Sequence, residues 1–117
     1  MRYFFPKSRR IVRSDRFTIV LRQGACAADG VLVLFAVAQS TPGPTRIGIT
    51  IPRRAGNAVI RNRWKRWIRE SFRTQWEHLP AGLDIVVRPK KGATPAWKTI
   101  RKSVPSLARK AAKRLQA

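Results

Sequence analysis

The chain has 117 residues, 44% of them hydrophobic, which fits a single domain over residues 1–117 with a modest core and excludes a disordered protein. Its 26 lysines and arginines face only 5 acidic residues, and the formal net charge of +21 indicates a polyanionic partner, nucleic acid before an anionic membrane. No apolar run approaches the ~20 residues that span a bilayer, and we expect neither a signal peptide nor a membrane partner.

The first element predicted is a short helix that follows a basic arm. The arm covers residues 1–13 and is expected to be irregular. Ser14 or Asp15 can cap the N-terminus of a helix that ends at Gly24. Cys26, the only cysteine, is interpreted as a small apolar residue; it excludes an internal disulfide and favours a reducing, cytoplasmic setting.

Two strands are predicted next. Residues 31–38 form an apolar run of strand length, and residues 45–51 alternate so that three isoleucines share one face. The sequence Thr-Pro-Gly-Pro at 41–44 is a strong turn signal between them. We therefore expect the two strands to pair as an antiparallel hairpin.

A long helix and a third strand follow. Asn57 is a suitable N-cap for a helix over 58–77, which the sequence Leu-Pro-Ala-Gly at 79–82 ends. Residues 83–88 predict the strand. The element order read from the residues up to this point is α-β-β-α-β.

A last helix completes an α+β sandwich with one sheet. Thr94 is expected to cap this helix, with Pro95 in its first turn. Pro105 lies within the helical pattern, where it lacks a donor and clashes with the preceding turn, so it should kink or divide the helix.

The long helix has two chemically different sides. At 100° per residue, an arc of about 140° holds apolar residues expected to pack on the sheet, although two tryptophans among them could instead stack on bases. These residues are Ile60, Trp64, Trp67, Ile68 and Phe72. The opposite arc is cationic and is expected to bind phosphates; it holds Asn62, Lys65, Arg66, Arg69 and Arg73. Arg61 lies at the edge of the apolar arc and could face a cleft.

Further candidates flank this helix. Arg53 and Arg54 precede its N-terminus, where free backbone N–H groups also favour an anion, so this loop and the first turn from Asn57 onward form a predicted phosphate site. Lys90 and Lys91 could extend it or be solvated. Two aromatics, Phe17 and Phe35, could be core residues or could line a groove that stacks unpaired bases.

An autonomous active site is not expected. The five acidic residues, Asp15, Asp29, Glu70, Glu77 and Asp84, are scattered over several elements, whereas phosphodiester hydrolysis usually requires clustered carboxylates or a histidine pair. Glu70 is expected to pair with Arg66 or Arg73. His78, the only histidine, lies at a helix end and is interpreted as a solvated cap.

With these residues in view, the chain resembles the protein component of bacterial ribonuclease P over nearly its whole length. The segments that carry the resemblance are RIGI at 46–49, GNAV at 56–59, RNRWKR at 61–66, IRESFR at 68–73 and DIVV at 84–87. The resemblance implies about four strands and three helices in the order α-β-β-β-α-β-α, with a left-handed crossover around the long helix.

The resemblance also implies a ribonucleoprotein endoribonuclease. Its partners would be a large catalytic RNA and precursor tRNA, with no obligate protein partner. The RNA, with bound Mg²⁺, would remove the 5′ leader, while the protein would hold no metal alone and perform no bond chemistry. Matching positions assign catalytic RNA contact to Arg61, Asn62, Arg63, Lys65, Arg66 and Arg69. They assign the leader cleft to Phe17, Phe35 and Lys90.

Two departures and two competing interpretations remain. Leu21 stands where the family often has a second aromatic, which predicts weaker stacking, and Pro105 leaves the length of the last helix open. A ribosomal protein would share this size and charge, but its cations lie more often in extended tails. A membrane-active or DNA-compacting protein would bind duplex DNA as tightly as structured RNA.

Overall fold

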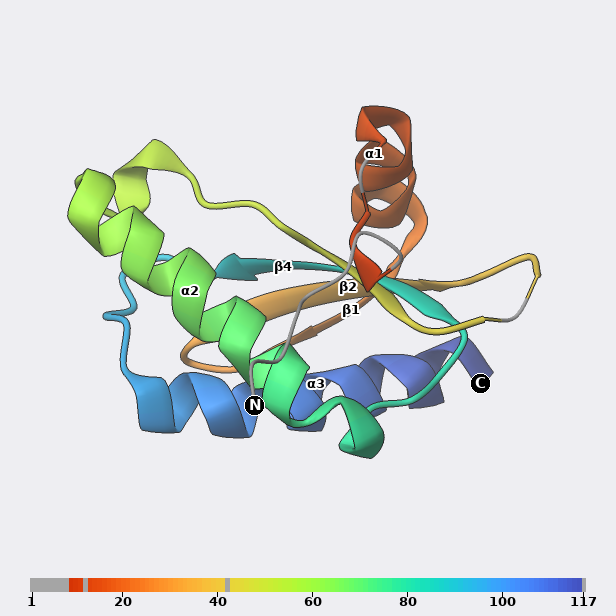
Figure 1. Ribbon diagram of the computed structural model, residues 1–117. Coiled ribbons are helices and arrows are strands. Elements are labelled where there is room, and N and C mark those ends of the chain that lie inside the picture. The colour runs from red at the N-terminus through yellow and green to blue at the C-terminus, as the bar shows by residue number, and fades with distance from the viewer. Residues whose placement is uncertain (1–8, 12, 42, 117) are drawn as a thin grey trace.

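The computed structural model describes residues 9–11, 13–41 and 43–116 (Figure 1). The elements are α1 Ser14–Gln23, β1 Ala25–Ala28, β2 Leu32–Ala38, β3 Arg46–Ile49, α2 Ala58–Thr74, β4 Leu83–Pro89 and α3 Trp97–Gln116, with 3₁₀ turns at Arg53–Ala55 and Trp76–His78. This order confirms the one that the resemblance implied, and β1 is the strand missing from the order read from the residues alone. Most of the predicted arm at 1–13 lies outside the described residues.

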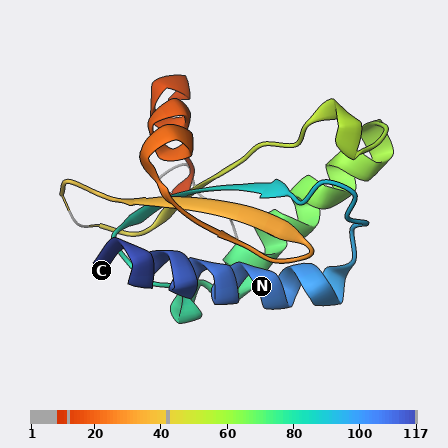
Figure 2. The same ribbon diagram turned by 180° about the vertical axis from the view of Figure 1, so that it is seen from behind.

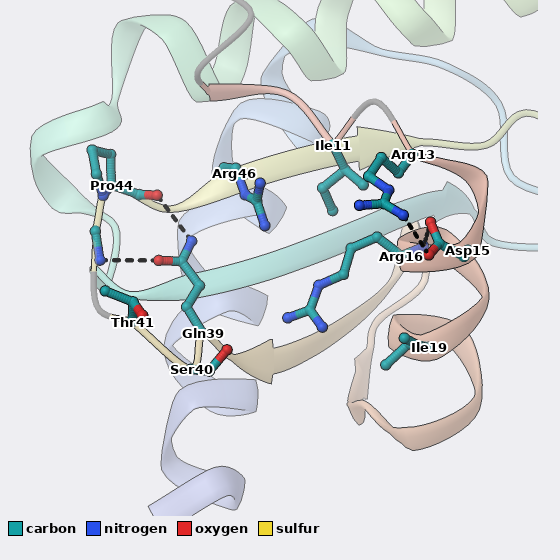
Figure 3. Close-up of a pocket in the computed structure, with 11 residues that line it drawn as sticks. Ile11, Arg13, Asp15, Arg16, Ile19, Gln39, Ser40, Thr41, Pro44 and Arg46 are labelled. Atoms are coloured by element: carbon teal, nitrogen blue, oxygen red, sulfur yellow. Dashed lines mark hydrogen bonds and ion pairs between the residues drawn. The ribbon is translucent and has the colours of Figure 1, made fainter.

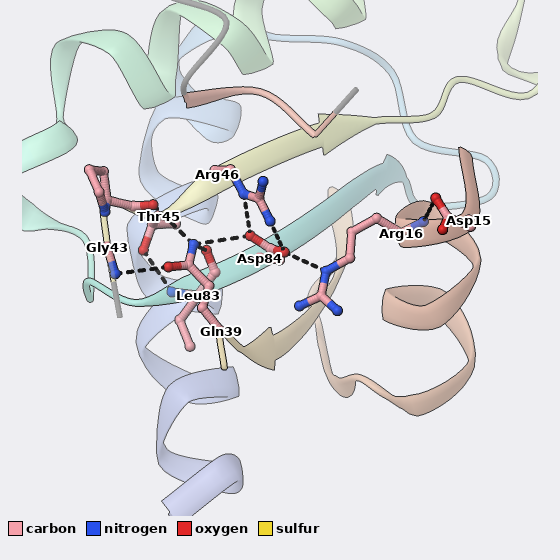
Figure 4. Close-up of polar contacts among 9 residues, drawn as sticks. Asp15, Arg16, Gln39, Gly43, Thr45, Arg46, Leu83 and Asp84 are labelled. Atoms are coloured by element: carbon pink, nitrogen blue, oxygen red, sulfur yellow. Dashed lines mark hydrogen bonds and ion pairs between the residues drawn. The ribbon is translucent and has the colours of Figure 1, made fainter. Parts of the chain in front are cut away.

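The strands form one mixed sheet in the order β1-β2-β4-β3. β2 pairs antiparallel with both β1 and β4, and β3 pairs parallel with β4. The predicted hairpin between the strands at 31–38 and 45–51 is therefore wrong, because β4 lies between them. Six of the seven β4 residues are buried, so this strand belongs in the centre of the sheet, where both of its faces are covered. The crossover from β3 through α2 to β4 has the rare left hand that the resemblance implied (Figures 1 and 4).

The sheet has helices on both faces. Figures 1 and 2 show α1 standing on one face, with α2 and α3 on the other. The main core lies on the second face, where Trp64, Ile68 and Phe72 of α2 pack with α3 and the sheet. A smaller cluster around Val20 and Val86 joins α1 to the first face. The predicted packing of the apolar arc of α2 on the sheet is thus confirmed for its buried members.

Strand register decides which residues face α1. Side chains alternate between the two faces, so Val86 of β4 and its partners Phe35 and Gly48 face α1 together. Cys26 of β1 is paired with Phe35 in the same row and is exposed, outside the core. One row of the sheet therefore carries an aromatic, a valine and a glycine beneath α1.

The predicted caps are confirmed for α2 and wrong for α1. Asn57 Oδ1 accepts the N–H of Ile60 at 3.0 Å, as expected of an N-cap. Before α1 the cap position is Arg13, whose side chain makes no capping hydrogen bond. The carboxylate of Asp15 instead accepts the neighbouring Arg16 N–H at 3.0 Å.

Two predicted helix boundaries are also wrong. α2 ends at Thr74, before the predicted residue 77, because the chain tightens into the 3₁₀ turn that follows. α3 begins at Trp97 and not at Thr94, and the carbonyl of Ala96 accepts the N–H of Ile100 at 3.0 Å.

The last helix is not divided at Pro105, contrary to one of the two outcomes predicted for it. The proline is buried inside a continuous α3 (Figure 2). Proline has no N–H to give to the carbonyl four residues earlier, that of Arg101. The Gln75 side chain supplies a donor, because its Nε2 lies 2.9 Å from that carbonyl oxygen. The end of α2 thereby repairs the hydrogen bond that α3 lacks.

Candidate nucleic-acid interface

The outer surface of α2 presents cations with little compensation. The exposed residues Asn62, Arg63, Lys65, Arg66 and Arg69 line a shallow hollow of about 610 Å³, together with Val59 and Glu70. We call these five residues the outer α2 surface. Like charges one turn apart destabilise a helix by tenths of a kcal/mol per pair, so a bound polyanion would relieve this surface.

Arg73 stands apart from the rest of the predicted ladder. Its side chain is only 19% exposed and forms an ion pair with Glu70, as predicted for that glutamate. Hydrogen bonding from Arg73 is the main reason that the pKa of Glu70 lies below its ordinary value, against the opposing effect of burial. Arg73 therefore has an internal partner that the outer α2 surface lacks.

Arg61 and the tryptophans face inward to different degrees. Arg61 is partly buried, and its Nε has no hydrogen-bond partner among the described residues. Trp64 is fully buried, whereas Trp67 is partly exposed with the guanidinium of Arg63 5.7 Å from its ring centroid. Base stacking on Trp64 is excluded by its burial.

A second hollow, the aromatic hollow, joins α1 to α2. It measures about 190 Å³ and is lined by Arg10, Ile11, Phe17, Ile47, Gly48, Ile49, Lys65 and Arg69. The ring of Phe17 lies directly over Gly48, where an added Cβ would come within 2.4 Å of two ring carbons. Lys65 and Arg69 line this hollow as well as the outer α2 surface. These two cations therefore lie between an aromatic site and a mainly cationic one.

The other two predicted cleft residues occupy different positions. Phe35 is partly buried in the same sheet row as Gly48, and the guanidinium of Arg88 lies 5.3 Å from its ring centroid. Lys90 is exposed and lines a separate hollow of about 320 Å³ that also includes Arg54 and Lys91. Lys90 thus adjoins the predicted phosphate loop, and Arg53 lies exposed in that same loop. The carboxamide of Asn57, another residue of the predicted phosphate site, is engaged as the α2 cap.

A buried carboxylate organises the sheet end beneath α1 (Figure 4). Asp84 is fully buried and accepts hydrogen bonds from Arg46 at 2.7 and 2.9 Å, from Arg16 at 2.6 Å and from Gln39 at 3.1 Å. Burial by itself would raise the pKa of Asp84, but these bonds and the charge of Arg46 outweigh it and hold the pKa below its ordinary value. Asp84 is therefore an ionised anchor between α1 and β3.

Two further acidic residues have structural roles. Asp29 accepts the N–H groups of Val31 and Leu32 and the hydroxyl of Ser103, which ties the β1–β2 turn to α3. Asp15 pairs with Arg13 at the exposed start of α1. His78 is exposed at the end of its 3₁₀ turn, as predicted. Among the residues that the structure describes, no three His, Cys, Asp or Glu side chains are grouped as metal ligands, and no helix is long and apolar enough to cross a membrane.

Comparisons with known proteins decide the family. The family model for Ribonuclease P matches residues 5–112. The chain belongs to the ribonuclease P protein family. The ribonuclease P protein component of Brevibacillus brevis is 36% identical over 86 residues, which cover 74% of this chain and 68% of that protein. The corresponding protein of Desulfovibrio desulfuricans is 38% identical over 93 residues, covering 79% and 72%.

Solved ribonuclease P proteins share the fold. A Staphylococcus aureus RNase P protein, a mutant described as defective in mRNA degradation activity, superposes with a TM-score of 0.81 at 28% identity, covering 91% of this chain and 90% of that one. The protein from Thermotoga maritima gives a TM-score of 0.78 at 28% identity, covering 86% and 96%.

The ribonuclease P fold brings together part of the predicted site and adds residues that the sequence interpretation missed. Phe17, Lys65 and Arg69 meet at one hollow, while Lys90 joins Arg54 and not Phe17. Leu21, the departure from the family pattern, packs in the small cluster with Phe17.

The missed residues are Arg10, Gly48, Arg88 and the cluster around Asp84. One signal for that cluster is present in the sequence: Asp84 is the lone acid inside an apolar strand. In a chain of net charge +21, such a residue predicts arginine partners.

Proposed function

We propose that this ribonuclease P protein is the subunit that binds a catalytic RNA and the 5′ leader of precursor tRNA, and that the RNA with its Mg²⁺ performs the cleavage. The observation that carries this proposal is the position of Lys65 and Arg69 between the outer α2 surface and the aromatic hollow. A single helix edge can thus hold two RNA segments side by side and offset their repulsion. The ribosomal alternative draws no support from the family comparisons.

The two sites suit different RNA segments. The outer α2 surface offers exposed cations, and none of the described residues that line its hollow is aromatic, which suits the phosphates of a folded RNA. In the aromatic hollow, the Phe17 ring could stack on an unpaired base, and stacking of this kind contributes ~1–3 kcal/mol per base. An unpaired leader fits that second description. We therefore assign the catalytic RNA to the outer α2 surface and the leader to the aromatic hollow.

The hollow of Arg54, Lys90 and Lys91 provides further phosphate contacts at the N-terminal end of α2. Among the described residues, three cations and no carboxylate line it. Neutralising ~8 phosphates over all of these surfaces predicts that log K falls with log salt concentration at a slope of about −6 to −7. We further propose that the complex acts in the cytoplasm and that its Mg²⁺ is held mainly by the RNA.

A cleavage assay on precursor tRNA tests this proposal. We expect the protein alone to leave the substrate intact, and the protein with its cognate catalytic RNA to release the leader at lower Mg²⁺ than the RNA alone. Footprinting on the catalytic RNA and on ribosomal RNA supplies a second comparison. Leader removal by the isolated protein, with contaminating RNA excluded, would contradict the division of labour between protein and RNA.

A further inference from the structure

A hollow that the proposed assignments leave unused shares Ile11 with the aromatic hollow. Figure 3 shows the side chains that line it. It measures about 600 Å³ and opens between the start of α1 and the segment that connects β2 to β3. Arg16 and Ile19 line it from α1, and Gln39, Thr41 and Arg46 line it from the sheet side. Arg13, just before α1, and Asp15 also line it, and their charges compensate each other in an ion pair. We call it the arginine hollow.

The two central arginines are oriented by Asp84. Arg16 gives only its Nε to the carboxylate, and Arg46 gives its Nε and Nη2 (Figure 4). A guanidinium carries five N–H donors, so most of the donors on Arg16 and one nitrogen of Arg46 have no partner among the described residues. Figure 3 shows both guanidinium groups directed into the hollow. The buried carboxylate therefore fixes the two forks before any ligand arrives.

The chemistry of this lining selects a phosphate over a base. None of the described residues that line the hollow is aromatic, so none of them can stack on a ring. Arginine forks match the oxygens of a phosphate in a bidentate manner, and the hydroxyls of Ser40 and Thr41 add donors at the rim. The two arginines and Asp84 together retain a net charge of +1, since one carboxylate compensates only one of them.

The position of the hollow identifies the RNA segment that would supply this phosphate. Ile11 lines both the arginine hollow and the aromatic hollow. Arg46 and Gly48, two residues apart on β3, face α1 from the same strand, a spacing of about 7 Å. We propose that the arginine hollow binds a backbone phosphate of the same single-stranded leader whose base stacks on Phe17. This inference rests on the proposed function of the aromatic hollow.

A charge placed at the rim tests the proposal without disturbing Asp84. Thr41 is exposed and lines the hollow. Thr41→Glu adds an anion there, and Thr41→Gln is the neutral control of the same size. Gln116→Glu adds the same charge at the exposed end of α3. The measurement is the Kd of the assembled ribonucleoprotein for precursor tRNAs with a series of leader lengths, together with the Kd of each protein for the catalytic RNA.

For the wild type, affinity should rise in steps as the leader lengthens. We expect Thr41→Glu to abolish the step gained when the leader reaches the arginine hollow, about tenfold in Kd for long leaders, while short leaders and the catalytic RNA bind as before. Thr41→Gln and Gln116→Glu should keep every step. Arg16→Lys, which can still pair with Asp84 but lacks the fork, should reduce the same step.

Three outcomes would overturn the inference. Equal weakening of all leader lengths by Thr41→Glu, or no weakening, would show that no leader phosphate lies there. Weakening of catalytic RNA binding alone would assign the hollow to the other RNA. If the wild-type protein itself shows no dependence on leader length, the proposed function of the aromatic hollow fails first, and the two failures are thus distinguished.

Discussion

The face of the sheet that carries α1 and the outer α2 surface are both cationic, yet they are constructed differently. On the α1 face, Arg16 and Arg46 share a fully buried carboxylate, and Phe17 lies against a glycine. On the outer α2 surface the exposed cations have no buried acid beside them among the described residues, and the nearby Glu70 is paired with Arg73. The one ring beside them in the described part of the chain is that of Trp67, near Arg63 and at the edge of the apolar side of the helix.

This difference shows that net charge alone does not assign a partner. Cations fixed by an internal counter-ion keep a set direction and a reduced charge, which suits recognition of one phosphate at one place. Cations without such a partner keep their full charge and mobility, which suits a broad polyanionic surface. The comparison predicts that loss of stability follows from changes to the buried contacts of Asp84 and Gly48 on the α1 face. Loss of affinity without loss of stability should follow from changes to the exposed cations of α2.

The largest effect is expected at Asp84. Asp84→Asn leaves Arg16 and Arg46 without their buried counter-charge, and breaking a buried ion pair costs about 3–5 kcal/mol. Glu70→Gln, which breaks the ion pair on α2, should cost less than 1 kcal/mol because that glutamate is 39% exposed. Urea unfolding of both variants at neutral pH measures the contrast. Equal losses would remove the distinction between the two faces.

Acid should remove the difference in stability between the wild type and Asp84→Asn. The pKa of Asp84 is lowered by folding, so its contribution to stability is complete above its ordinary pKa of 3.8 and is lost as the pH falls through the lower folded value. The free energy of unfolding of the wild type should therefore decline toward that of Asp84→Asn below about pH 4. A constant gap between the two proteins down to pH 2 would contradict this.

A methyl group at Gly48 should disturb the aromatic hollow from beneath. In Gly48→Ala the new Cβ would lie 2.4 Å from the Phe17 ring, so the ring must shift. Overpacking of this kind costs about 1–3 kcal/mol. Thermal unfolding measures the stability, and leader binding measures the displaced ring. Gly30→Ala, at a glycine with open space around it, is the matched control.

Removal of the aromatic ring should affect the leader alone. Phe17→Ala is expected to weaken binding of precursor tRNA with a leader by ~1–3 kcal/mol, because one stacking platform is lost. Leaderless tRNA should bind as it does to the wild type. An equal loss for both substrates would count against the assignment of the hollow.

The smallest effect is expected from single cations on α2. Arg66→Ala or Arg69→Ala should leave the fold intact and weaken binding to the catalytic RNA, with the magnitude of the salt slope reduced by about 1. Arg61→Ala should also weaken assembly. Because Arg69 lines both sites, its loss should also affect the leader, whereas that of Arg66 should not. Titrations at several salt concentrations measure both effects.

Much of this arrangement could be predicted from the sequence, because local patterns specify it. The apolar period of 58–74, the Asn57 cap and the run at 83–88 each identify an element through nearby residues. β1 was missed because Ala25–Ala28 is short and lacks branched or aromatic residues. Pairing was mispredicted because a turn at 41–44 favours a hairpin locally, whereas β4 gains more by burial between β2 and β3.

The candidate sites likewise combine residues that local sequence patterns predict with residues that only the fold brings together. The cations of α2 follow from helical spacing, but the grouping of Phe17 with Lys65, and of Lys90 with Arg54, depends on contacts between distant segments. The resemblance to ribonuclease P proteins supplied Phe17, Phe35 and Lys90 as one cleft, and the structure places Phe17 and Lys90 in separate hollows. No local pattern indicates that Gln75 completes α3 opposite Pro105.

The central claim, that the two faces hold two different RNAs, is tested most directly by measuring Phe17→Ala and Arg66→Ala side by side. Each protein is titrated with the catalytic RNA, and each assembled complex is then titrated with precursor tRNA with and without its leader. The account predicts that Phe17→Ala loses only the leader contribution and that Arg66→Ala loses only affinity for the catalytic RNA. If both variants weaken both interactions by similar factors, the two faces do not act separately and the account is contradicted.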